Sequence, residues 1–149
     1  MAPLTQAEVD GVVAELNPFL TSDDKKIELG LGAYRALLCA KPEYIQMFTK
    51  LQGLTVDNVF QSEGIKYYAK TLVEDLVKML MSASQDDEIQ KLLIHSGNQH
   101  TSRKVNKQQF MSGESIFIDY FNKTLRKPEN KAAMEKFLKH SFPVIADNI

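Results

Sequence analysis

The sequence contains three histidines, and their neighbours predict different environments for them. Residues that favour burial recur three or four positions apart in one helical segment, at Ile89, Leu92, Leu93 and Ser96. His100 continues this stripe by one turn and is expected to point inward, whereas His95 and His140 are expected to face solvent. An inward His100 can donate one ring N–H to the hydroxyl or carbonyl of Ser96 and ligate a metal through the other nitrogen. The alternative is a core histidine that only forms hydrogen bonds.

Two tyrosines are also expected to point inward, from different helices. Tyr68 shares a helical face with the apolar residues Ile65, Leu72 and Leu76. The adjacent Tyr67 falls on another face, with Gly64, Thr71 and Glu74. Tyr34 lies on an apolar stripe between Leu31 and Leu38. A phenol is protonated at neutral pH and can donate a hydrogen bond; the alternative is a packing residue whose hydroxyl reaches the surface or a carbonyl.

Apolar residues recur at helical spacing along nearly the whole chain, which predicts an all-α fold. The first helix begins with Thr5 and Glu8 spaced as a capping box, and the second is opened by a turn at Ser22 and ended by Lys41-Pro42. The later helices are predicted over 42–48, from caps at Thr55 and Asp57 to Met81, and over 88–100, 106–125 and from Pro128 onward. Pro143 is expected to bend or end the last helix.

Composition restricts the classes of function. A chain of 149 residues with 44% apolar residues is expected to form one domain, over 1–149. The formal charge of −1 provides no electrostatic footprint for nucleic acid or an anionic membrane. A single cysteine, no signal-peptide pattern and no transmembrane stretch predict a cytoplasmic protein. Phosphate-loop, HExxH and CxxC motifs are absent.

The aromatic and methionine side chains at helical spacing are expected to pack in the core or to line a binding site for a flat apolar ligand. They are Met47, Met79, Phe110, Phe117 and Phe121.

Several stretches of the chain resemble the globins, and the trematode (flatworm) haemoglobins in particular. They are GLGAY (30–34), QSEGIKYYA (61–69), HTSRKV (100–105), FMSGE (110–114) and KFLKHSFP (136–143), with Pro42, Phe48, His100 and Phe110 at globin-like separations. The resemblance covers nearly the whole chain. It implies a single-domain globin fold of about seven to eight helices enclosing a haem pocket.

The resemblance also implies the roles of individual residues. His100 would be the proximal ligand of a haem b iron, and Phe48 would stack on the porphyrin. Tyr34 and Tyr68 would form the distal pair, where vertebrate globins usually keep a distal histidine. Further residues expected to line the haem are Leu72, Ser96, Val105 and Phe110. Two phenol donors imply tight oxygen binding with slow release, and carbon monoxide and nitric oxide are expected as further ligands.

Three functions are compatible with these residues. The first is a protein that binds oxygen without being an enzyme, for storage, scavenging or transport, as a monomer or weak homo-oligomer. The second is a haem enzyme with peroxidase-like or nitric oxide dioxygenase activity, although the sequence has no distal His–Arg pair and no reductase domain. The third is an all-α interaction module without a cofactor.

Overall fold

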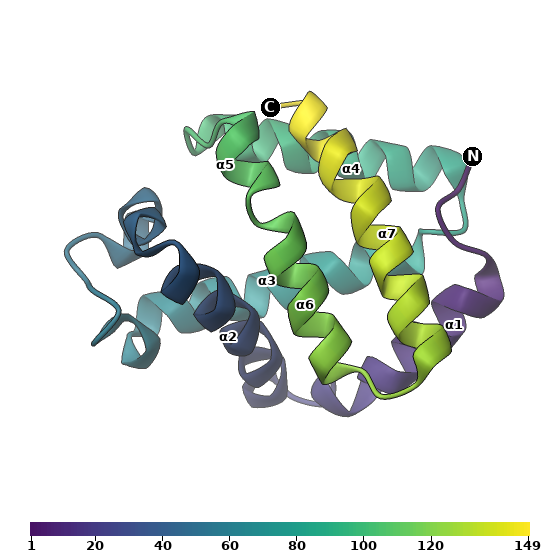
Figure 1. The fold of residues 1–149 in the computed structure, drawn as a ribbon, viewed down its shortest axis with the longest axis horizontal. Coiled ribbons are helices and arrows are strands. Elements are labelled where there is room, and N and C mark those ends of the chain that lie inside the picture. The colour runs from purple at the N-terminus through teal and green to yellow at the C-terminus, as the bar shows by residue number, and fades with distance from the viewer. The chain divides into compact units, whose positions relative to one another are not determined.

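The computed structural model describes residues 1–149, and all its regular elements are helices (Figure 1). The α-helices are α1 (Gln6–Leu16), α2 (Asp23–Ala40), α3 (Glu63–Met81), α4 (Asp86–Ser102), α5 (Lys107–Met111), α6 (Glu114–Thr124) and α7 (Pro128–Asp147). Short 3₁₀ segments lie between them, namely η1 (Asn17–Phe19), η2 (Pro42–Met47), η3 (Thr49–Leu51) and η4 (Val59–Gln61). The predicted all-α fold is confirmed.

The chain forms two compact units. One contains residues 1–17 and 77–149, and the other contains residues 18–76. The first unit therefore holds α1, α4 to α7 and the end of α3, while the second holds α2, the segments η2 to η4 and most of α3. None of the helices combines the length and apolar character that crossing a bilayer requires.

Helix α7 organises the first unit, because it packs against α1, α4, α5 and α6 (Figure 1). Its buried side chains include Ala133, Met134, Phe137, Leu138, Phe142, Ile145 and Ala146. Of the two outcomes expected at Pro143, a bend or an end of the helix, the end does not occur, since α7 continues to Asp147. Proline removes one helical hydrogen bond, but burial of Phe142 and Ile145 on either side stabilises the helical path.

The N-terminus of α7 is capped by a carboxylate from another helix. Glu15 of α1 accepts hydrogen bonds from the backbone N–H groups of Arg126 and Lys127 and from the side-chain amide of Asn130. Burial alone would raise the pKa of Glu15, but the hydrogen bonds from Asn130, Arg126 and Lys127 outweigh it and hold that pKa below its usual range. The carboxylate thus pairs the two backbone N–H groups that immediately precede α7, and its negative charge lies near the positive end of the helix dipole.

Several predicted helix ends need correction. The capping box of Thr5 and Glu8 is confirmed, as is Ser22 at the start of α2. Thr55 and Asp57 do not cap the long helix, because they form a turn and α3 begins only at Glu63. There, the Ser62 hydroxyl accepts the N–H of Ile65 at 3.2 Å.

The predicted helix over 106–125 is also two helices rather than one. Ser112 ends α5, and its hydroxyl donates to the Gln109 carbonyl at 2.6 Å, while α6 begins at Glu114 after Gly113. The apolar period continues across the break, which is why spacing alone did not reveal it.

The second unit depends on a close approach of two helix backbones. A Cβ added at Gly30 of α2 would lie 2.1 Å from the Ala69 carbonyl oxygen of α3, so only glycine fits there. Around this crossing, α2, η2, η3, η4 and α3 enclose a cluster of buried residues, namely Leu38, Ile45, Leu51, Val59, Phe60 and Ile65.

Replacing Gly30 with alanine is expected to destabilise the protein. In an open helix this change stabilises by about 1 kcal/mol. Here the new methyl group would meet main-chain atoms of Ala69, and we expect a loss of about 1–3 kcal/mol or more. Urea unfolding measures the difference, and a more stable Gly30→Ala variant would contradict the observed crossing.

Glu15→Gln is expected to lower the free energy of unfolding by about 1 kcal/mol at pH 7, since it removes a charged helix cap. Because folding lowers the pKa of Glu15, its contribution is present at neutral pH and is lost as the pH falls through the folded pKa. The difference from wild type should therefore shrink in acid.

The matched control for this prediction is Glu135→Gln, which removes a solvent-exposed ion pair with Lys139 within α7. It should change stability by no more than about 0.5 kcal/mol. Equal stability of Glu15→Gln and wild type at pH 7 would show that the carboxylate does not act as a cap.

Candidate functional site

The second unit brings together three of the residues singled out in the sequence: Tyr34, Phe48 and Tyr68. The Phe48 ring lies 5.6 Å from that of Tyr34 and 5.0 Å from that of Tyr68, both in edge-to-face geometry. All three are half-buried and pack against the buried cluster of this unit. Phe48 thus separates two phenols that come from different helices.

The helix crossing explains why both tyrosines reach this cluster. Tyr34 follows Gly30 by one turn of α2, and Tyr68 immediately precedes Ala69 in α3. Phe48 reaches the same place because it ends η2 with an extended backbone, at φ −94° and ψ 118°. Gly30 therefore contributes to this arrangement, because it lets the backbones that carry Tyr34 and Tyr68 approach each other closely.

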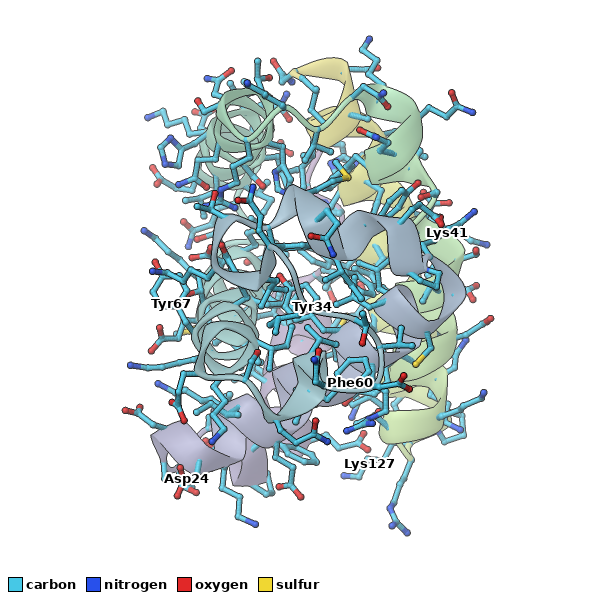
Figure 2. All side chains as sticks on the ribbon, turned by 90° about the vertical axis from the view of Figure 1, so that its left-hand side faces the viewer. Asp24, Tyr34, Lys41, Phe60, Tyr67 and Lys127 are labelled. Atoms are coloured by element: carbon cyan, nitrogen blue, oxygen red, sulfur yellow. The ribbon has the colours of Figure 1, made fainter.

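The two adjacent tyrosines of α3 have different environments, as the helical period predicted. Tyr67 is 54% exposed, whereas Tyr68 is half-buried against the cluster. Figure 2 shows Tyr67 on the outer side of α3 and Tyr34 among packed side chains. The Lys50 ammonium lies 4.9 Å from the centre of the Tyr67 ring, which is consistent with a cation–π contact at the surface.

The hydroxyl of Tyr68 accepts a hydrogen bond from the main chain. The backbone N–H of Lys50, in η3, lies 3.2 Å from it. A phenol oxygen that accepts from an N–H still has its own proton to donate. The contact therefore leaves the Tyr68 proton available for donation to a further polar group.

The first unit brings together a second set of predicted residues, namely Ser96, His100, Val105 and Phe110. His100 Nδ1 lies 2.7 Å from the Ser96 carbonyl oxygen, one turn earlier in α4. The Phe110 ring is 4.7 Å from the imidazole, and the backbone N–H of Val105 donates to the His100 carbonyl at 3.0 Å. The predicted link between His100 and Ser96 is thus present, through the carbonyl of Ser96 and not its hydroxyl.

The Ser96 contact determines the tautomer of His100. A carbonyl oxygen can only accept, so Nδ1 must carry the proton that is donated to it. The lone pair of the neutral ring then resides on Nε2, which is the form in which an imidazole ligates a metal. The donor chemistry of His100 therefore fits the proximal position of a haem.

The other predicted residues are placed as follows. Leu72 lies one turn after Tyr68 in α3 and is half-buried. His95 is exposed, as predicted, whereas His140 is half-buried, so the prediction that His140 faces solvent is only partly confirmed. Among the aromatic and methionine stripes, only Phe121 is fully buried, while Met47, Met79, Phe110 and Phe117 are half-buried.

Sequence reasoning missed two residues near these groups. The Phe142 ring lies 4.8 Å from that of Phe110 and 6.0 Å from that of Phe117. It therefore packs against the same Phe110 ring that contacts His100. Its place on the buried face of α7 was a usable signal. Lys50 gave no signal, because its contact with Tyr68 uses a main-chain N–H of a short 3₁₀ segment.

Comparison with known proteins gives consistent results. The family model of the globins matches residues 31–145. A globin of Isoparorchis hypselobagri is 40% identical over 147 residues, covering 98% of this chain and 99% of that relative. A globin of Dicrocoelium dendriticum is 46% identical over 144 residues, covering 97% of this chain and 94% of that relative. The expected similarity to trematode globins is confirmed.

Solved structures show the same fold at low sequence identity. Ferric Aplysia limacina myoglobin superposes with a TM-score of 0.79 at 18% identity, covering 97% of this chain and 98% of that one. A globin-like protein of C. elegans gives a TM-score of 0.75 at 18% identity, covering 95% and 90% of the two chains. With the family match and the two close relatives, these likenesses lead to one conclusion: the chain belongs to the globin family.

Proposed function

We propose that this globin binds haem b through His100 and reversibly binds molecular oxygen with high affinity. The observation that carries the proposal is the 2.7 Å contact of His100 Nδ1 with the Ser96 carbonyl, because it puts the lone pair of the ring on Nε2. A bound haem would supply a ferrous iron able to take up a diatomic gas. Membership of the globin family supports this cofactor.

Tyr34 and Tyr68 are the proposed hydrogen-bond donors to the oxygen ligand. Tyr68 accepts from Lys50 N–H, which favours donation of its own proton elsewhere. Two donors of about 1.5 kcal/mol each would stabilise the oxygen-bound protein by about 3 kcal/mol, or on the order of 100-fold in affinity. Carbon monoxide is less polar when bound and should gain less, and nitric oxide is a further expected ligand.

The remaining residues form the proposed lining of the haem. Phe48 is assigned to stack on the porphyrin, and the other apolar contacts are assigned to Leu72, Val105 and Phe110. Ser96 acts through its carbonyl on His100. We further propose that residues 1–149 form one globin domain, since the family match over 31–145 includes parts of both compact units. A cytoplasmic location and a monomeric or weakly associating state stay predictions.

High affinity bears on the physiological role. A carrier must release its ligand at the working oxygen pressure, and slow release favours storage or scavenging over delivery. We therefore propose reversible oxygen binding as the function, with storage or scavenging favoured over delivery as the physiological role. Turnover of peroxide or nitric oxide with a reductant would instead indicate an enzyme.

Replacing either distal tyrosine with phenylalanine should speed oxygen release. For Tyr34→Phe and Tyr68→Phe we expect an increase of about 10-fold each, because each change removes one donor. Stopped-flow measurement of oxygen dissociation tests this. Tyr67→Phe is the matched control, since Tyr67 is 54% exposed and its release rate should equal that of wild type. An unchanged rate in Tyr68→Phe would reject its role as a donor.

His100→Gly should weaken haem binding severely. Loss of residues that merely orient a metal ligand costs about 10–100-fold in affinity, and loss of the ligand itself should cost at least as much. Added imidazole should restore the haem absorption band by occupying the vacated position. His95→Gly, at an exposed site on the same helix, is the control and should bind haem normally. Full haem affinity of His100→Gly without imidazole would refute the assignment.

A further inference from the structure

Residue 50 meets helix α3 through its backbone as well as its side chain. Its N–H donates to the Tyr68 hydroxyl at 3.2 Å, and its ammonium lies 4.9 Å from the centre of the Tyr67 ring. Its carbonyl oxygen is so close to α3 that a Cβ at Gly64 would approach it to 2.6 Å. Three positions of α3 are thus held against one residue of η3.

We propose that the peptide N–H of Lys50 is a positioning group for Tyr68, which holds the phenol oxygen in place and directs its proton toward the gas ligand. This inference rests on the proposed function, because it specifies how one distal donor is prepared. Lys50 itself is not proposed to touch haem or ligand. Its main-chain N–H acts through the hydroxyl of Tyr68.

The N–H of Lys50 is available for this task because of its place in η3. The first donors of a helical segment have no partner within that segment. In η3 the internal hydrogen bond runs from the Leu51 N–H to the Phe48 carbonyl, so the Lys50 N–H points to another group. That group is the Tyr68 hydroxyl.

The segment that carries this N–H is itself held in place. Leu51 is fully buried in the cluster of the second unit. Just beyond it, the Gln46 side chain donates to the Leu54 carbonyl and accepts from the Gly53 N–H, both at 2.8 Å. Gly53 adopts the turn conformation, with φ +87°, that allows this. The donor at residue 50 is therefore fixed relative to the cluster on which Tyr68 packs.

The Tyr68 ring is also held from two sides. Phe48 contacts it at 5.0 Å and Tyr67 at 5.4 Å, both edge to face. With its ring held by neighbours and one lone pair engaged by Lys50, the hydroxyl needs little rearrangement to donate. A donor that is already oriented contributes more to slow release than a mobile one does.

Amide hydrogen exchange tests the contact without reference to haem. In the full-length protein, followed by NMR, Tyr68→Phe should speed exchange of the Lys50 amide about 10-fold, because it removes the acceptor. Tyr67→Phe keeps that acceptor and should change the rate by no more than about twofold. Equal exchange of this amide in wild type and Tyr68→Phe would overturn the inference, whether or not the protein binds haem.

A double-mutant comparison tests the link to the gas ligand. Lys50→Pro removes the N–H and should speed oxygen release by up to about 10-fold, whereas in the Tyr68→Phe background it should have almost no further effect. Equal acceleration in both backgrounds would show that residue 50 acts independently of Tyr68. Should Lys50→Pro fail to fold, the exchange comparison decides alone. Failure of the wild type to bind haem would overturn the proposed function and leave the exchange result intact.

Discussion

The second unit depends on the contact between the backbones of α2 and α3 at Gly30 and Ala69. With a Cβ at position 30 only 2.1 Å from the Ala69 carbonyl, any other residue would separate the helices. The consequence reaches the candidate site directly, because Tyr34 is one turn from Gly30 and Tyr68 is next to Ala69. Both phenols therefore lie beside Phe48 for the same reason. The absence of a side chain at Gly30 allows the helix crossing that brings the two tyrosines to Phe48.

In each of the two units a main-chain group contacts one of the candidate site residues. The Ser96 carbonyl accepts from His100 Nδ1, which leaves the ring lone pair on Nε2. The Lys50 N–H donates to the Tyr68 hydroxyl, which favours a phenol that donates. The Ser96 carbonyl fixes the tautomer of His100, the Lys50 N–H occupies one acceptor position of Tyr68, and an aromatic ring packs against each of the two side chains.

Local chemistry explains what could be predicted from the sequence. The capping box at Thr5, the helix end at Lys41-Pro42 and the opposite faces of Tyr67 and Tyr68 each depend on residues within one or two helical turns. At the start of α3 the error was a choice among local caps, because Ser62 caps the helix and Thr55 and Asp57 do not. At Pro143 the error arose because packing with distant helices carries α7 past the proline. The Lys50 contact was unpredictable because a backbone N–H is present at almost every residue, and only the tertiary path of η3 selects this one.

The central claim is that this globin holds haem through His100 and binds oxygen reversibly, and the absorption spectrum of the purified protein tests it most directly. After haem is supplied and the protein is reduced, we expect an oxygenated haem spectrum in air that converts to the deoxygenated form under argon and returns when oxygen is readmitted. Repeated cycles without loss of the band would support reversible binding. Absence of a protein-bound haem band after reconstitution would contradict the account and leave only the helical fold.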